Sequence, residues 1–153
     1  MTMSHDHKPH LETEVNRINE AGGKIINGRV NGNLNLTRSL GDLVYKRQPL
    51  RGPEKQIISC YPEVIEQTLD GTEQLLALAC DGIWDVLSNA QLVQKVQKYI
   101  SFGYSLKDTC ERITMDCLSK RPYDEPGWDN MTLIVVKFKS YNVILDNSKT
   151  PIL

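Results

Sequence analysis

The order of apolar and polar residues predicts three amphipathic helices. The first begins after Pro9, and its apolar positions recur at helical spacing until Gly22-Gly23, a pair that favours a helix end. A Ser-x-x-Gln capping box at Ser88 precedes the second helix, and the third starts near Ser105. Their apolar stripes are Leu11, Val15 and Ile18; Leu92, Val93, Val96, Tyr99 and Ile100; and Leu106, Cys110, Ile113 and Cys117.

Between these helices the pattern predicts β-strands and tight turns. Asn27-Gly28 and Asn31-Gly32 each favour a hairpin turn. The expected strands cover residues 56–61, 63–69, 73–79 and 132–138. The last of them is an unbroken apolar run, which favours a strand covered on both faces. Runs of strands separated by paired helices indicate the α+β class with a layered arrangement.

Composition and charge exclude several classes of partner. The 18 Lys and Arg nearly balance the 19 Asp and Glu, so nothing indicates binding to nucleic acid or to an acidic membrane surface. No apolar stretch reaches the ~20 residues that span a bilayer. The four cysteines form no Cys-x-x-Cys pair and favour buried thiols in a reducing compartment, so a cytoplasmic or nuclear location is expected.

Two acids stand at the ends of predicted strands. Asp81 directly follows the strand 73–79, and Asp129 precedes the strand 132–138. If these strands are antiparallel neighbours, the two carboxylates meet at one end of the sheet, where Mg²⁺ or Mn²⁺ would offset their repulsion. Gly82 would allow a close backbone approach there. The alternative is structural, since Asp-Gly is a common turn and Asp85 could begin a helix.

Three ordered motifs resemble the metal-dependent protein phosphatase 2C family. They are RVNGNLNLTRSLGD (residues 29–42), LALACDGIWDVLS (76–88) and WDNMTLIVV (128–136), and residues 5–25 also resemble the family's segment before them. The resemblance covers about residues 4–138. It implies the C-terminal part of a layered antiparallel β-sandwich flanked by antiparallel helices, in residues 1–140, followed by a tail in 141–153.

The resemblance also implies an activity and a site. The family dephosphorylates phosphoserine and phosphothreonine proteins with a water held by two Mg²⁺ or Mn²⁺ ions, and further ions can bind. Asp81 and Asp129 correspond to ligands of the first metal. Asp85, together with Asp81, corresponds to a holder of a weaker metal, while Asn130 and Gly82 support the ligands.

A loop over residues 43–54 corresponds to the family's flap beside the active site. Its cations Lys46, Arg47 and Arg51 would either meet a phosphopeptide or form a solvated face. Arg38 and Asp42 are expected near the site, Asp42 as a turn or network residue. Trp84 is expected to pack in the core.

The sequence also departs from the family. The family's Asp-Gly-His segment, which supplies a bridging ligand and the general acid, is absent, because the only Asp-Gly pairs are 70–71 and 81–82. We therefore assign no catalytic residue and expect a C-terminal portion that is inactive alone. The competing hypothesis is a pseudophosphatase that binds proteins, with a partner or a second copy covering an exposed sheet face.

Overall fold

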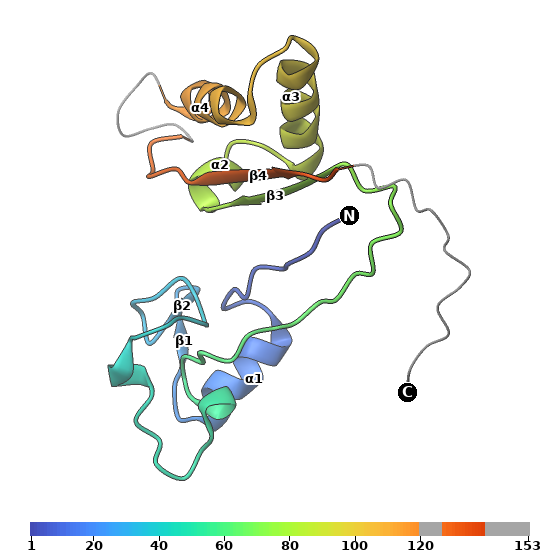
Figure 1. The fold of residues 1–153 in the computed structure, drawn as a ribbon. Coiled ribbons are helices and arrows are strands. Elements are labelled where there is room, and N and C mark those ends of the chain that lie inside the picture. Colours follow the sequence, from blue (N-terminus) through green and yellow to red (C-terminus); the bar gives the residue numbers. More distant parts are fainter. Residues whose placement is uncertain (120–126, 140–153) are drawn as a thin grey trace, which may run out of the picture. The chain divides into compact units, whose positions relative to one another are not determined.

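The computed structural model describes residues 1–119 and 127–139, which fall into two compact units that divide between Gln67 and Thr68. Unit 1 runs from Met1 to Gln67, and unit 2 contains the described residues from Thr68 onward (Figure 1). Each unit combines helix with an antiparallel sheet, so the predicted α+β class is confirmed. The predicted tail 141–153 lies outside the described residues.

Unit 1 consists of one helix, a small hairpin and two short 3₁₀ turns. Its elements are α1 (Glu12–Glu20), β1 (Ile25–Ile26), β2 (Arg29–Val30), η1 (Leu43–Tyr45) and η2 (Pro53–Lys55). The first predicted helix is confirmed as α1, which ends before Gly22, a residue in the left-handed region with φ of 83°. Three fully buried residues from separate parts of the unit form its core: Ile18, Val30 and Ile58.

Both Asn-Gly pairs form the predicted turns. Asn27 and Gly28 have positive φ values of 51° and 72° and join β1 to β2, which pair in antiparallel register. Asn31 and Gly32 repeat this conformation directly afterwards, and the chain then returns to pair with β2. Positive φ at both central residues is the geometry that two-residue hairpins require, which explains why Asn-Gly occupies both places.

The strands predicted at 56–61 and 63–69 are wrong. The first segment contributes only an isolated parallel bridge between Ser59 and Arg38, and the second has no strand. The apolar pattern of the first segment reflects instead the fully buried Ile58, which anchors the segment in the core of unit 1. Periodicity alone does not distinguish an anchored irregular segment from a paired strand.

Unit 2 packs two helices on a two-stranded antiparallel sheet. Its elements are β3 (Leu75–Ala79), α2 (Asp81–Trp84), α3 (Asn89–Ser101), α4 (Leu106–Cys117) and β4 (Leu133–Lys137). The predicted capping box is present at Ser88, and the Ser105 side chain caps α4. Both helices lie on the same side of the sheet (Figure 1). None of the helices in the described residues is long and apolar enough to cross a membrane.

The core of unit 2 lies between these helices and one face of the sheet. Its fully or nearly buried members are Ile83, Leu87, Leu92, Val96, Ile113, Cys117 and Val135. The predicted stripe of α4 is therefore confirmed. The stripe of α3 is confirmed except for Val93, which is 41% exposed because the apolar run is wider than the face that the sheet and α4 cover.

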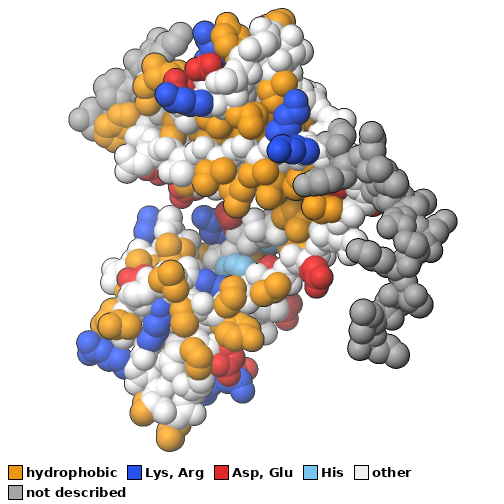
Figure 2. All heavy atoms as spheres, viewed as in Figure 1, with side chains coloured by type: hydrophobic (Ala, Val, Ile, Leu, Met, Phe, Trp, Pro, Cys, Tyr) orange, Lys and Arg blue, Asp and Glu red, His pale blue; other side chains and the backbone are white. Residues whose placement is uncertain are grey.

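The other face of the sheet carries apolar side chains that no described helix of unit 2 covers. Cross-strand pairs place Leu76 opposite Val136 and Leu78 opposite Ile134. Leu78 is 48% exposed and Ile134 is 54% exposed. We call these four residues the open face, and Figure 2 shows hydrophobic side chains along this side of unit 2. The prediction that strand 132–138 is covered on both faces is thus wrong for the described residues.

Candidate metal-binding site

Asp81 and Asp129 lie at the same end of the β3–β4 ladder. The strands are antiparallel neighbours, and the last ladder pair joins Ala79 to Leu133. The Cys80 N–H extends this ladder by donating to the Thr132 carbonyl oxygen at 3.2 Å. Asp81 follows as the first residue of α2, and both acids are exposed. The expected pairing of the two strands is therefore confirmed, and it gathers the two acidic segments at one edge.

Cys80 links the segments of Asp81 and Asp129 by hydrogen bonds beyond the last pair of the ladder. Its Sγ accepts from the Thr132 N–H at 3.1 Å and donates to the Asn130 carbonyl oxygen at 3.3 Å. The thiol is half-buried and bonds to a residue fifty positions away in the chain. It therefore links the two segments by hydrogen bonds rather than packing in the core. Neither segment can shift along the sheet without breaking these contacts.

Gly82 is required by a close approach of backbone atoms. A Cβ built at this position would lie 2.3 Å from the carbonyl oxygen of Asn130, far inside van der Waals contact. The approach expected from the sequence is thus present, and its partner is Asn130. The Gly82 N–H also donates to Asp81 Oδ1 at 3.1 Å, and the Asn130 N–H donates to Asp129 Oδ1 at 2.7 Å. Each carboxylate is therefore oriented by the N–H of the residue that follows it.

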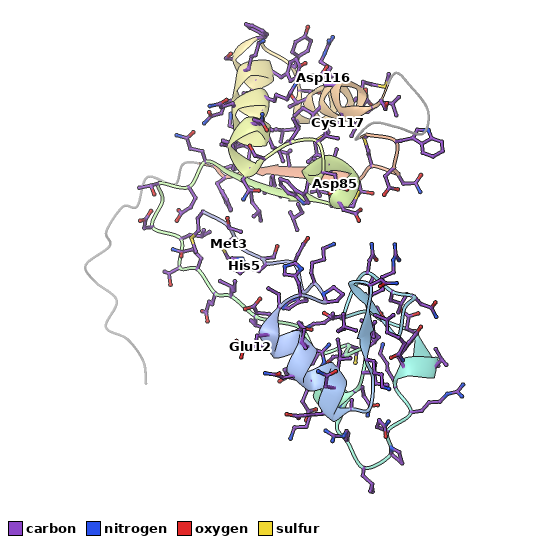
Figure 3. All side chains as sticks on the ribbon, turned by 180° about the vertical axis from the view of Figure 1, so that it is seen from behind. Met3, His5, Glu12, Asp85, Asp116 and Cys117 are labelled. Carbon is purple, nitrogen blue, oxygen red and sulfur yellow. The ribbon has the colours of Figure 1, made fainter. Side chains whose placement is uncertain are left out.

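Asp85 lies one helical turn beyond Asp81. Its N–H donates to the Asp81 carbonyl oxygen at 2.8 Å, and its side chain is exposed (Figure 3). Asp81 begins α2 and Asp85 follows its last residue, so the alternative in which Asp85 begins a helix is wrong. Three acids thus lie near one end of the sheet of unit 2.

The carboxylates of Asp81, Asp85 and Asp129 are of the kind that binds hard divalent cations, but they do not form a complete metal site. Carboxylate oxygens are the ligands that Mg²⁺ and Mn²⁺ prefer. Within residues 1–119 and 127–139, however, no three side chains of His, Cys, Asp or Glu are grouped so that they could hold a metal ion. The assignment of Asp81 and Asp129 as ligands stays a prediction, and the two would supply part of a coordination sphere rather than all of it.

Lys46 is engaged within its own unit. Its Nζ donates to the Ser39 carbonyl oxygen at 2.6 Å and also to the Gly41 carbonyl oxygen. Asp42 accepts from the Ser39 hydroxyl at 2.6 Å and has a left-handed φ of 50°. The ammonium of Lys46 therefore holds the turn that contains Asp42. The contact of Lys46, Arg47 and Arg51 with a phosphopeptide stays a prediction.

Trp84 differs from expectation, whereas Arg38 has partners within its own unit. Trp84 was expected in the core, but it is 37% exposed, because its indole Nε1 donates to the Ala79 carbonyl oxygen at 2.8 Å and holds the ring at the end of β3. Arg38 was expected near the metal ligands. That placement stays a prediction; within unit 1 its guanidinium contacts Glu14 at 2.6 Å and the Tyr61 carbonyl oxygen at 3.2 Å.

Glu14 is a charged residue that sequence reasoning missed. Its side chain is fully buried and accepts hydrogen bonds from Arg17, Arg38 and the Thr37 hydroxyl, each at 2.6 Å. Burial by itself would raise the pKa of Glu14, but these donors outweigh it and lower the pKa to about 2. The available signal was its position four residues before Ile18, on the inner face of α1.

Comparison with known proteins identifies relatives over most of the chain. The family model described as protein phosphatase 2C matches residues 1–125. Probable protein phosphatase 2C 11 of Oryza sativa subsp. japonica is 45% identical over 137 residues, which cover 90% of this chain and 38% of the relative. Protein phosphatase 2C homolog 2 of Schizosaccharomyces pombe is 42% identical over 137 residues, 89% of this chain and 37% of the relative. The chain thus spans under two fifths of the length of these relatives.

Solved structures give the same result. A phosphatase from a pathogenic strain of Toxoplasma gondii superposes with a TM-score of 0.73 at 28% identity, over 90% of this chain and 42% of that one. A sex determining protein of C. elegans superposes with a TM-score of 0.64 at 31% identity, over 87% of this chain and 31% of that one. The family model and the Toxoplasma gondii structure therefore both indicate similarity to phosphatases.

Proposed function

Since the chain belongs to the protein phosphatase 2C family, we propose that it forms part of a metal-dependent enzyme that dephosphorylates phosphoserine and phosphothreonine proteins. One observation carries this proposal. The two acids of the family-like motifs, Asp81 and Asp129, lie at the same end of an antiparallel strand pair, although 47 positions separate them in the chain. If Asp81-Gly82 served only as a turn, Asp129 would not need to lie at the same end of the sheet.

Each residue of the site has a role in the proposal. Asp81 and Asp129 hold one Mg²⁺ or Mn²⁺ ion, and Asp85 helps Asp81 to hold a further, weaker one. When bound, such ions lower the pKa of coordinated water and so supply the nucleophile for attack on phosphorus. Gly82 and Asn130 set the spacing between the two acidic segments, since the Asn130 carbonyl oxygen packs where a Cβ would be.

The chain alone is proposed to bind metal weakly and to lack activity. Two monodentate carboxylates leave most positions of an octahedral ion to water. We propose that the remaining ligands of the complete centre belong to the part of the family's domain that this chain does not span. The substrates are then phosphoproteins of the whole enzyme, as in the family.

Tryptophan fluorescence tests the metal ligands directly. The chain has two tryptophans, Trp84 three residues after Asp81 and Trp128 directly before Asp129. Paramagnetic Mn²⁺ bound at these acids is expected to quench their emission at millimolar concentration. Asp129→Asn and Asp81→Asn should each raise the Mn²⁺ concentration needed for half-maximal quenching about ten-fold or more. Either change removes one of the two carboxylates proposed to bind the first ion.

The control variant is Glu111→Gln, which removes one exposed carboxylate from α4 in the same unit and should leave the quenching unchanged. Hydrolysis of a small aryl phosphate by the same samples supplies a second readout, and none is expected. Equal quenching in all variants would show that Asp81 and Asp129 do not bind the metal ion. Hydrolysis that Asp129→Asn abolishes would show that the chain is catalytically complete.

A second candidate function is a non-catalytic protein-binding module. The open face favours it, because Leu78, Ile134 and Val136 expose apolar surface that a partner or a second copy could cover. This function predicts a chain whose fluorescence and thermal unfolding are indifferent to both Mn²⁺ and a chelator. A metal response that depends on Asp129 would exclude it as the sole role.

A further inference from the structure

Unit 2 has an open groove on its helical layer, formed by the end of α3, the turn after it and the outer side of α4. Its volume is about 570 Å³, within the range that accommodates a ligand's side chains. We call it the α3–α4 groove. Its aromatic part consists of Tyr99 and Tyr104, and its acidic part consists of Asp108, Glu111 and Asp116. None of the candidate metal ligands lines it; Figure 3 labels Asp116 on the helix layer and Asp85 at the end of α2.

The aromatic part of the groove is held in place by several contacts. The rings of Tyr99 and Tyr104 meet edge to face, with centroids 5.8 Å apart at 75°. The Tyr99 hydroxyl donates to Asp116 Oδ2 at 2.8 Å, and Lys95 Nζ donates to the same oxygen at 2.6 Å. A ligand would therefore meet a wall that is already ordered, which reduces the entropy lost on binding.

The face of Tyr104 already holds a cation. The guanidinium carbon of Arg112 lies 4.0 Å from the ring centroid, well within the range of a cation–π contact. Arg112 is an exposed residue of α4, so water can hydrate it once it leaves the ring. The chain itself thus shows that this face accepts a planar guanidinium group.

Charges around the ring favour a cationic ligand. Asp108 stands in the first turn of α4 and accepts from the neutral hydroxyl of Ser105 at 2.7 Å. The Glu111 carboxylate lies 3.7 Å from the ammonium of Lys107, and both side chains are exposed. The hydrogen bond from Lys95 lowers the pKa of Asp116 and keeps that carboxylate ionised at neutral pH. Asp116 already pairs with Lys95, so Asp108, Glu111 and the aromatic face remain to receive a cation once Arg112 is displaced.

We propose that the α3–α4 groove is a docking site for an arginine-containing segment of a partner protein, whose guanidinium takes the place that Arg112 holds over Tyr104. Arg112 is then an internal competitor for the site. This role predicts the direction in which each substitution changes the binding affinity. Removal of an acid weakens docking, whereas removal of Arg112 strengthens it. The proposal does not depend on phosphatase activity, since it uses only α3, α4 and the turn between them.

Fluorescence anisotropy of a labelled peptide tests the proposal on the complete 153-residue chain. The probe is a fluorescein-labelled peptide of alternating arginine and glycine, and its counterpart has glutamate in place of arginine. Glu111→Gln should weaken binding of the arginine peptide about two- to five-fold, the range that an exposed charge pair supplies. Arg112→Gln should strengthen it by a similar factor. Both residues are exposed, so neither substitution threatens the fold.

Glu66→Gln is the matched control, because it removes the same charge from an exposed position in unit 1 and should leave binding unchanged. Tyr104→Ala should reduce binding even when the charges are intact. An equal effect of Glu66→Gln and Glu111→Gln would overturn the proposal by showing unspecific attraction. Absence of measurable binding would overturn it as well. If Arg112→Gln weakens binding and the glutamate peptide binds better, the groove instead takes an acidic segment through Arg112.

Discussion

Glu14 is ionised at neutral pH although its side chain does not reach solvent. Two guanidinium groups and one hydroxyl surround its oxygens, and Arg17 also donates to the Thr37 carbonyl oxygen at 2.7 Å. The carboxylate therefore ties α1 to the segment around Thr37 and Arg38. Sequence reasoning could not anticipate this network, because the pairing of residues 24 positions apart depends on the tertiary fold rather than on helix periodicity.

Removal of the Glu14 charge should destabilise unit 1. Glu14→Gln is expected to lower its free energy of unfolding by about 3 kcal/mol, because two arginines lose their buried counter-charge. Urea unfolding followed by far-UV circular dichroism measures this loss. Glu20→Gln, an exposed change on the same helix, should stay within about 0.5 kcal/mol of the parent chain.

The same carboxylate predicts a pH dependence. Its pKa of about 2 in the folded chain lies below the ordinary 4.5, so its stabilisation is complete above about pH 4.5 and is lost as the pH falls toward 2. The difference corresponds to about 3 kcal/mol. Glu14→Gln should remove this part of the acid sensitivity. An unchanged pH profile in the variant would contradict the assigned network.

At the scale of elements, the local signals in the sequence predicted most of the structure correctly. The helices α1, α3 and α4, the two Asn-Gly turns and the Ser88 capping box depend on nearest neighbours in the chain, and all are present. The failures occurred where pairing depends on distant residues. Segment 56–69 has strand-like composition but gains only a single bridge, and α2 is too short for periodicity to reveal.

The candidate site was predictable to the same extent. The strand-end positions of Asp81 and Asp129 followed from the apolar runs beside them, and their meeting required only that the two strands pair. The hydrogen bonds of the Cys80 thiol could not be predicted. Their partners are backbone atoms of Asn130 and Thr132, which the register of β3 and β4 brings close. The engagement of Lys46 within unit 1 depends likewise on the shape of its turn.

The junction of β3 and α2 gives a prediction for Gly82. Gly82→Ala should destabilise unit 2 by about 1–3 kcal/mol and weaken the response to Mn²⁺, because the new Cβ displaces the Asn130 backbone and with it Asp129. Urea unfolding and the tryptophan titration measure the two effects. Gly103→Ala is the control: its Cβ meets no atom within 4 Å, although its φ of +86° costs about 1 kcal/mol, and the metal response should persist. A normal metal response in Gly82→Ala would contradict this role of the close approach.

At the scale of the whole molecule, the described residues form two hydrophobic cores. The cluster around Ile18, Val30 and Ile58 belongs to unit 1, and the cluster around Leu92 and Ile113 belongs to unit 2, with no residue in common. Both tryptophans lie in unit 2. Their fluorescence therefore reports the unfolding of unit 2, whereas circular dichroism reports both units.

This division predicts that the two optical signals separate. In urea, Glu14→Gln should lower the midpoint of the part of the circular dichroism change that comes from unit 1 and leave the fluorescence midpoint in place, because the contacts of Glu14 lie in unit 1. Gly82→Ala should shift the fluorescence midpoint. If Glu14→Gln shifts both signals equally, the two units unfold as one cooperative structure.

The open face of the β3–β4 sheet also affects how the chain behaves in concentrated solution. Leu78, Ile134 and Val136 present apolar surface, and the two strands of this sheet have no further strand paired beside them among the described residues. Such a surface with free backbone edges is a template for self-association. With a net charge of only -1, the chain has little long-range repulsion to oppose this. We therefore expect this side of the sheet to promote association at high concentration, and Ile134→Lys to raise the solubility of the chain.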